Sequence, residues 1–233
     1  MSTKLQIQRV ECGVHVTPTY PPCGHAMCRN LPNVRTSYIK SVSIVVYTKD
    51  YFVVGECGMG KNYGQVMTCS GKVELWDQCF AATAIREMRE ELKLPKHNLD
   101  SSPRFECASI LGSKVRKVVF LFNCTDLDIA AMQHEVKVAY SNALTVLSEK
   151  VFGNRVPSAM DLQYLRYTKD EPKEVTVATT NGEMRCLHCI PHKGISYDCA
   201  GILTFSCECI EEMLRVSCGK ERYSRDTDVV WTK

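Results

Sequence analysis

Three glutamates carry the clearest potential for chemistry in the chain. Glu87, Glu90 and Glu91 stand at positions i, i+3 and i+4 of a stretch with helical periodicity, so a helix would present them on one face. Carboxylates this close repel one another unless a cation neutralises them, and proteins bind Mg²⁺ through a few carboxylate oxygens, with water and substrate phosphates completing the shell. The pattern indicates a divalent-metal site. The alternative is a solvated charged face in which Arg86 pairs with Glu90.

The helix that would position these glutamates is predicted over residues 79–92. Its apolar residues recur at spacings of three and four and form one stripe, Ala81, Ala84, Ile85, Met88 and Leu92. Asp77 is the expected N-cap, and Pro95 follows the last turn as a stop signal. Gly71 lies in the loop before the helix, where a glycine lets the backbone approach a ligand closely.

The residues in and before this helix also resemble a known motif. Residues 86–91 (Arg-Glu-Met-Arg-Glu-Glu) match the Arg-Glu-apolar-any-Glu-Glu core of the Nudix box. Residues 71–74 (Gly-Lys-Val-Glu) resemble the common opening of that motif, and Leu94 matches its apolar close. Between about residues 38 and 167 the sequence therefore resembles the Nudix hydrolase family.

The match departs from the motif in three places. The span from residue 71 to residue 86 is one residue longer than usual, with the extra residue around positions 76–78. Asp77 stands near the position of a usual glutamate, and Lys93 replaces the glycine near the end of the helix. Because the three glutamates are all present, these departures bear on substrate positioning more than on metal binding.

The resemblance implies an α/β fold, a Nudix-like α/β/α sandwich with a mixed sheet over residues 38–167. The residue pattern agrees, since β-branched and aromatic runs alternate with helical stretches. Strands are predicted at 43–48, 51–54, 66–68, 105–111, 115–123 and 135–140, a hairpin turn at 112–113, and further helices at 142–150 and 158–167. Residues 1–37, punctuated by prolines, are expected to be an irregular Cys-containing lead-in segment, and residues 168–233 a Cys/His-rich C-terminal extension.

By resemblance, the glutamates of the box hold Mg²⁺ or Mn²⁺. Glu87, Glu90 and Glu91 are the expected metal ligands, with the carbonyl of Gly71 as a further one. Arg86 is expected to orient the glutamates through charge-assisted hydrogen bonds. Such a metal centre neutralises the negative oxygens of a diphosphate bridge and lowers the pKa of a bound water.

Two further residues have expected roles at this site. Lys72 would meet a substrate phosphate, although an exposed surface lysine is an equal interpretation. Glu135 lies in a segment that resembles the family's strand-then-helix unit after the box, where a glutamate acts as an additional metal ligand or general base. The alternative for Glu135 is a solvent-facing strand residue. Catalysis would then depend on Glu90, Glu87, Glu135 and Arg86.

The implied activity is divalent-metal-dependent hydrolysis of a diphosphate linkage in a nucleoside diphosphate derivative. The expected partner is a nucleotide or a nucleotide-capped RNA, and a capped or triphosphorylated RNA 5′ end is one candidate substrate. A free dinucleotide, a sugar nucleotide or a damaged nucleoside triphosphate fits the same residues. The rival hypothesis is a catalytically weak Nudix-fold binding module with zinc-stabilised interaction surfaces.

Cysteine and histidine residues form a second notable pattern. Cys186, Cys189 and His192 could supply three ligands to a structural Zn²⁺, with Cys199, Cys207 or Cys209 as the fourth. Residues 23–28 hold another partial set of two cysteines and a histidine. Neither set has two Cys-x-x-Cys pairs at finger spacing, so ordinary thiols in a reducing compartment are the alternative.

Composition limits the remaining classes. Of the 233 residues, 45% are hydrophobic and 24% charged, as in ordinary globular proteins, and the net charge of +3 is too small for a dedicated nucleic-acid binder. No run of eighteen apolar residues occurs, so no membrane span is expected. The first residues lack the apolar stretch of a secretory signal, so the fourteen cysteines are interpreted as thiols of an intracellular, cytoplasmic protein. The sequence does not indicate an oligomeric state.

Overall fold

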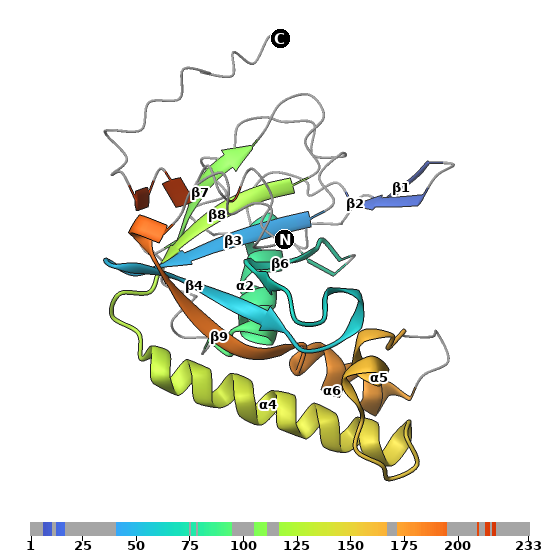
Figure 1. The fold of residues 1–233 in the computed structure, drawn as a ribbon. Coiled ribbons are helices and arrows are strands. Elements are labelled where there is room, and N and C mark those ends of the chain that lie inside the picture. The colour runs from blue at the N-terminus through green and yellow to red at the C-terminus, as the bar shows by residue number, and fades with distance from the viewer. Residues whose placement is uncertain are drawn as a thin grey trace.

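A central mixed sheet organises the chain (Figure 1). The computed structural model describes residues 7–10, 13–16, 41–74, 76–77, 79–94, 105–110, 117–166 and 172–194, together with residues 209, 213, 214, 216 and 217. The strands of the sheet are β3 (Ser41–Tyr47), β4 (Tyr51–Cys57), β5 (Val66–Met67), β6 (Cys69–Lys72), β7 (Phe105–Ile110), β8 (Lys117–Asn123) and β9 (Met184–Pro191). Their order is β5-β4-β3-β8-β7, with β6 also paired to β3 and β9 to β4.

The pairing confirms the mixed character expected of the sheet. β3 and β8 run parallel, whereas the other pairs in the sheet are antiparallel. β7 and β8 form the predicted antiparallel pair, and the hairpin turn expected at 112–113 lies outside the described residues. A separate hairpin of β1 (Ile7–Val10) and β2 (Gly13–Val16) lies in the lead-in segment, so the expectation that this segment is irregular is wrong there.

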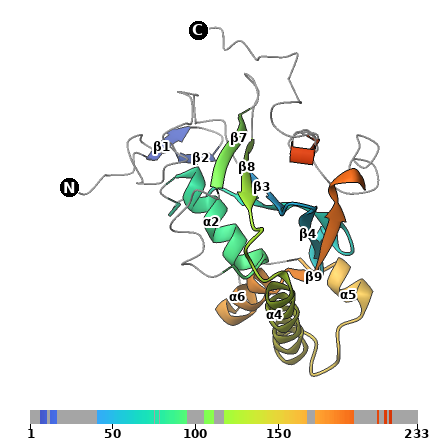
Figure 2. The same cartoon turned by 90° about the vertical axis from the view of Figure 1, so that its left-hand side faces the viewer.

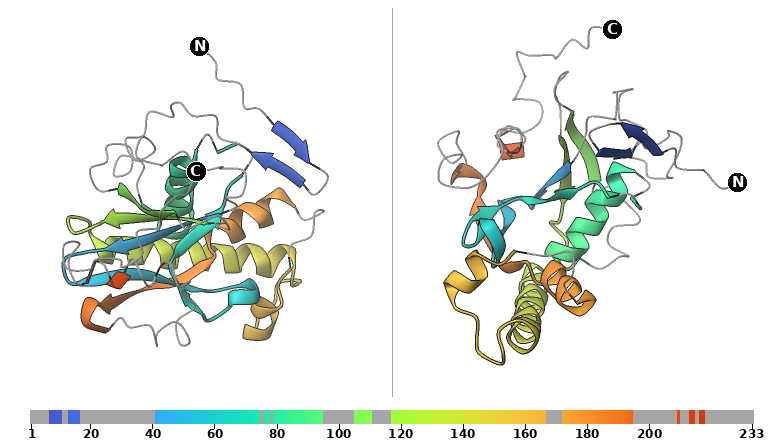
Figure 3. Two further views of the ribbon diagram at one scale, coloured as in Figure 1. Left: turned by 90° about the horizontal axis from the view of Figure 1, so that it is seen from above. Right: turned by 90° about the vertical axis from the view of Figure 1, so that its right-hand side faces the viewer.

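The helices in the described part of the chain are α2 (Phe80–Glu91), α4 (Ile129–Lys150), α5 (Ala159–Gln163) and α6 (Lys173–Asn181). Two short 3₁₀ turns are η2 (Gly60–Asn62) and η3 (His192–Gly194). The stripe of α2 and the first half of α4 pack on one face of the sheet, and Cys209 and Met213 pack on the other. Figure 2 shows α2 standing against the sheet, and Figure 3 shows α5 and α6 gathered near α4. None of the described helices is long and apolar enough to cross a membrane.

Helix α4 corrects one prediction from the sequence. The strand expected at 135–140 is wrong, because these residues belong to the 22-residue α4, whose N-cap Asp128 accepts a hydrogen bond from the backbone NH of Ala131 at 2.9 Å. The alternation around Val136 has the period of a strand, but buried side chains recur over the whole segment at helical spacing, at Met132, Val136, Ala143 and Leu147. The helix predicted at 142–150 is the second half of α4, and the one predicted at 158–167 is the shorter α5.

Strand β9 lies beyond the boundary expected at residue 167. It pairs with β4 along its whole length, from Tyr51 opposite Pro191 to Cys57 opposite Met184. Met184 also fills the space beside Gly55, where an added Cβ would come within 2.6 Å of its sulfur. The first part of the expected C-terminal extension therefore contributes an edge strand to the sheet.

Candidate functional site

The glutamates of α2 face a pocket rather than open solvent. Glu87 is 8% exposed and Glu91 5% exposed, while Glu90 is partly exposed. The pocket has a volume of about 410 Å³ and is lined by these three carboxylates together with Glu74 and Glu183. The alternative of a solvated charged face therefore does not describe Glu87 and Glu91, which are removed from water at a cost unless a cation compensates them.

Gly71, on β6, has a steric reason to be glycine. A Cβ built at this position would overlap the carboxyl group of Glu87. β6 pairs with β3, with Gly71 opposite Val42, so the sheet fixes the backbone that faces the helix. The absence of a side chain lets the Glu87 carboxylate lie directly against the strand.

Arg86 links the loop to the helix. Its guanidinium donates to Glu87 at 2.5 Å, to Glu90 at 3.2 Å, and to the backbone carbonyl of Lys72 at 2.8 Å. It also forms a two-point contact with Asp77, at 3.1 and 3.0 Å. A planar guanidinium with several fixed donors holds such a set in one geometry, so Arg86 sets the orientation of two pocket carboxylates relative to the loop.

Asp77 has a different role from the one predicted. It is not the N-cap of α2, because Cys79 occupies that position and its sulfur accepts from the backbone NH of Ala82 at 3.3 Å. Asp77 is buried and accepts instead from Thr83 Oγ1 and the Glu74 backbone NH, both at 2.9 Å, as well as from Arg86. The loop around the extra residue is thus tied to the helix by a buried carboxylate.

Glu183 is the pocket residue that sequence reasoning missed. It lies between α6 and β9, where its backbone carbonyl accepts from Gly58 NH at 2.7 Å and its carboxylate lies 3.8 Å from the thiol of Cys57. The pairing of β9 with β4 brings it into the pocket of the α2 glutamates. No local motif predicts that Glu183 lies near the α2 glutamates, because this proximity depends on a strand pairing between distant segments.

Three of the pocket carboxylates, Glu87, Glu91 and Glu183, have a raised pKa. Burial is the main cause that raises the pKa of Glu87 to about 7, and the neighbouring Arg86 only partly opposes it. Burial, followed by the charges of Glu183 and Glu87, holds the pKa of Glu91 well above its ordinary range. Burial and the charge of Glu90 raise the pKa of Glu183. A divalent cation would relieve this repulsion, and an all-oxygen donor set suits Mg²⁺ or Mn²⁺.

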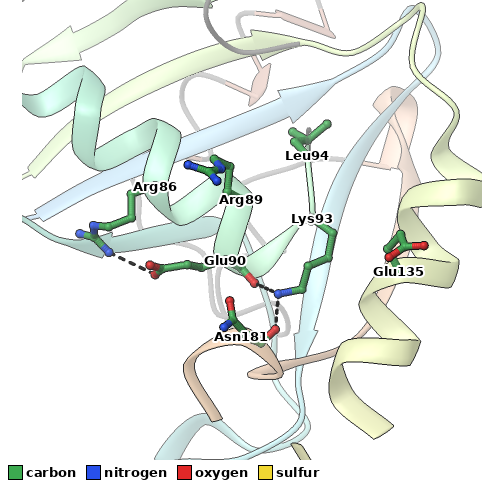
Figure 4. A pocket seen from close by; sticks show the side chains of 7 residues that line it. All are labelled: Arg86, Arg89, Glu90, Lys93, Leu94, Glu135 and Asn181. Carbon is green, nitrogen blue, oxygen red and sulfur yellow. Dashed lines mark hydrogen bonds and ion pairs between the residues drawn. The ribbon is translucent and has the colours of Figure 1, made fainter. Parts of the chain in front are cut away.

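A second pocket, of about 470 Å³, adjoins the first and shares Arg86 and Glu90 with it. Figure 4 shows Lys93 reaching the backbone carbonyls of Glu90 and Asn181. Lys93 has a φ of +58°, in the left-handed region where glycine is preferred, so the residue that replaces the glycine of the motif keeps a glycine-like backbone.

Glu135 and Lys72, the two further residues predicted for the site, line different pockets. Glu135 is exposed on α4 and lines the second pocket, not the pocket of the buried carboxylates. Lys72 is exposed and lines the carboxylate pocket directly. Glu135 therefore lies on a helix beside the adjoining pocket, and not on the strand expected at that position.

The residues proposed for zinc do not come together as predicted. Cys186 and Cys189 are three residues apart on β9, and side chains alternate between the two faces of a strand. His192 follows in η3 and stacks against Phe52, with ring centroids 4.4 Å apart. Cys199 and Cys207 lie outside the described residues. The predicted Cys186, Cys189 and His192 set is therefore not assembled by this strand.

Comparisons with known proteins give partial likenesses. No family model matches the chain, and no curated protein matches it. Among solved structures, a bifunctional NMN adenylyltransferase/ADP-ribose pyrophosphatase from Francisella tularensis is 21% identical with a TM-score of 0.27, over 36% of this chain and 26% of that one. A MutT/nudix family protein from Enterococcus faecalis is 13% identical with a TM-score of 0.30, over 40% of this chain and 39% of that one. The NUDIX domain of Shewanella oneidensis NrtR, complexed with ADP-ribose, is 13% identical with a TM-score of 0.28, over 41% of this chain and 66% of that one.

Proposed function

We propose that this protein is a divalent-metal-dependent hydrolase that cuts a diphosphate linkage in a nucleoside diphosphate derivative. The observation that carries the proposal is the convergence of Glu87, Glu90, Glu91 and Glu183 on one pocket from two separate parts of the chain. Burial raises the pKa of three of these carboxylates, Glu87, Glu91 and Glu183, and the charge of a neighbouring carboxylate adds to the shift. Strongly perturbed pKa values cluster at functional sites.

The roles of the residues follow from their positions. Glu87, Glu90 and Glu91 would hold Mg²⁺ or Mn²⁺, with the Gly71 carbonyl as a further ligand. The bound metal supplies charge neutralisation at the phosphates and a more acidic water. Arg86 keeps two of the glutamates in place through the contacts described above, so the ligands are oriented before substrate arrives.

Glu183 is our candidate for the proton acceptor, in place of Glu135. It lines the carboxylate pocket, whereas Glu135 lines the neighbouring one. A base functions best when its pKa approaches the working pH, and burial moves the pKa of Glu183 in that direction. The thiol of Cys57 lies 3.8 Å from the Glu183 carboxylate and does not replace it as an acceptor, because burial raises the pKa of that thiol to about 12.

Cations beside the carboxylates suit an anionic substrate. Lys72 stands at the edge of the carboxylate pocket, and Arg89 and Lys93 line the adjoining one. Glu90 borders both pockets, so phosphate groups bound near the metal ligands would extend toward Arg89. A nucleotide-capped or triphosphorylated RNA 5′ end is the narrower proposal within this substrate class.

The test is hydrolysis of a substrate panel over a Mg²⁺ and Mn²⁺ titration. The panel should hold capped RNA, triphosphorylated RNA, ADP-ribose, a sugar nucleotide and nucleoside triphosphates. Glu90→Gln keeps the shape of the side chain and removes one charge, so turnover should fall by orders of magnitude while the fold persists. Glu149→Gln, on the exposed end of α4, is the matched control and should retain wild-type turnover.

Two outcomes would overturn the proposal. Equal turnover by the wild type and Glu90→Gln on a cleaved substrate would remove the site from catalysis. Nucleotide binding without turnover of any panel member, at any metal concentration, would favour the binding-module hypothesis instead.

A further inference from the structure

A group of side chains of the types that bind metals lies on the sheet face opposite α2. Glu56 on β4 and Cys186 and His188 on β9 bring one carboxylate oxygen, one thiol and one imidazole nitrogen within 4.8 Å of one another. His188 Nε2 lies 2.9 Å and Cys186 Sγ 3.2 Å from Glu56 Oε2, and the sulfur and the nitrogen are 3.4 Å apart. The three atoms form a compact triangle.

Strand pairing places these three residues together. Glu56 is directly opposite Cys186, and Val54 is opposite His188, so His188 is the diagonal neighbour of Glu56 on the same face. Phe52 and Val54, which alternate with Glu56 along β4, pack in the apolar cluster beneath Cys209 and Met213. The triangle thus belongs to the face opposite the one on which α2 lies, and none of its three residues lines the carboxylate pocket.

We propose that Glu56, Cys186 and His188 form a zinc site that joins β4 to the edge strand β9, with water in the fourth position. Zinc in proteins takes thiolate, imidazole and carboxylate ligands at about 2.0–2.3 Å, so the donor atoms of a tetrahedral site lie roughly 3.3–3.6 Å apart. The three separations here, 2.9, 3.2 and 3.4 Å, need only a slight expansion to accept the ion. A mixed sulfur, nitrogen and oxygen set favours zinc over Mg²⁺.

The positive charge of Arg185 is the main factor that opposes zinc binding at this site. Its guanidinium is paired with Glu56 Oε1, while the imidazole and the thiol both face Oε2. The ion would therefore use the second oxygen and leave the ion pair in place, although two cations would then share one carboxylate. Cys186 must also lose its proton to bind, so affinity should rise with pH.

The site would fix the position of Glu183. This residue immediately precedes β9, and Gly58, which binds its carbonyl, follows β4. A metal bridge between Glu56 and β9 therefore spans the same two strands that bring Glu183 to the carboxylate pocket. Zinc binding is expected to stabilise the fold, since an ion that binds only the folded state shifts the folding equilibrium.

Metal content of the full chain tests the proposal. The protein should be loaded with zinc in excess Mg²⁺, which occupies the all-oxygen pocket, and its zinc measured after removal of free ion. Cys186→Ser and His188→Ala should each carry about one zinc equivalent fewer than the wild type and lose the zinc-dependent rise in melting temperature. In the cobalt-substituted wild type, the thiolate-to-cobalt absorption should be reduced by Cys186→Ser.

Two variants separate this site from the other thiols. Cys189→Ser changes an exposed cysteine three residues along the same strand and should retain the wild-type zinc content. Arg185→Gln removes the competing cation and should tighten zinc binding. Zinc content and melting temperature that are the same in the wild type, Cys186→Ser and His188→Ala would overturn the proposal, whether or not the protein hydrolyses nucleotides.

Discussion

The two faces of the sheet carry carboxylates in opposite electrostatic situations. On the α2 face, Glu87, Glu91 and Glu183 crowd together, and burial raises the pKa of each. On the other face, burial also pushes the pKa of Glu56 upward, but hydrogen bonds with His188 and Cys186 and the charge of Arg185 outweigh it and lower the pKa. In the first cluster the charge of Arg86 does not offset burial, whereas in the second cluster the hydrogen bonds and the charge of Arg185 do.

This difference separates what each cluster can bind. The crowded cluster gains from any hard dication because it offers only oxygens and excess negative charge. In the Glu56 cluster the charge of a bound cation contributes less to affinity, and the softer sulfur and nitrogen donors contribute more. The same sheet can therefore hold two sites with different metal preferences.

The largest expected effect is a loss of turnover on substitution of Glu183, which the same substitution of Glu135 should not cause. Glu183→Gln should lower kcat by about 10²- to 10⁴-fold, the usual contribution of a positioned base. It should also move the acidic limb of the pH–rate profile, because activity that needs ionised Glu183 is lost as pH falls through its raised pKa. Because the pocket carboxylates interact, the pKa of this limb belongs to the cluster as a whole and not to one residue.

Glu135→Gln is the matched control, since it makes the same change in the adjoining pocket. It should leave both kcat and the acidic limb close to those of the wild type. A large loss in Glu135→Gln with a small one in Glu183→Gln would return the role of base to the residue predicted from sequence.

A second prediction concerns the contact between Gly71 and Glu87. Gly71→Ala places a methyl group where the Glu87 carboxylate lies, and displacement of a metal ligand by about 1 Å can reduce turnover roughly 10²-fold. Gly153→Ala is the control, since Gly153 has a φ of +60° and open space around it. That control should cost about 1 kcal/mol of stability and leave turnover unchanged, so equal activity of the two variants would contradict the contact.

The smallest expected effect is a pH dependence of stability with opposite signs on the two faces. In metal-free protein Glu87 has its pKa raised to about 7, so the folded state holds a proton that the unfolded chain releases near pH 4.3, the usual value for glutamate. The contribution of Glu87 to the free energy of unfolding is present below about pH 4.3, and it is lost as the pH rises through 7. Glu87→Gln should therefore melt a few degrees above the wild type at pH 8, by roughly 2–4 °C per kcal/mol, and not at pH 5.

Glu56→Gln should show the reverse. The folded-state pKa of Glu56 is lowered, so its contribution is present above the ordinary carboxyl pKa and lost as pH falls through the lowered value. The variant should melt below the wild type at neutral pH, with the gap closing in acid. Parallel pH curves for the two variants, measured by thermal unfolding without metal, would remove the contrast between the faces.

The sequence predicted helix α2 well because its signal is local. Spacings of three and four among Ala81, Ala84, Ile85 and Met88 are set by the helix itself, and the structure buries this stripe. The same spacing rule placed the three glutamates near one another. The prediction of Asp77 as N-cap was wrong because Cys79, two residues later, caps the helix through its sulfur, an uncommon capping group.

Features that depend on distant pairing could not be read from the sequence. Glu183 follows an Asn-Gly pair and looks like part of a turn, yet the pairing of β9 with β4 makes it a pocket residue. The Glu56, Cys186 and His188 cluster depends on the register of the same two strands. Glu135 was misplaced for a different reason, because a short alternation around Val136 outweighed a helical spacing that extends over 22 residues.

The pairing of β4 with β9 also has a consequence for how the molecule is made. Glu56 and Cys186 are 130 positions apart, and closing a loop of this length delays folding relative to local contacts. During synthesis the helix with three glutamates is complete long before residue 183 is added. A nascent chain therefore carries an unfinished pocket, and it acquires the carboxylate of Glu183 only when β9 has left the ribosome and joined the edge of the sheet.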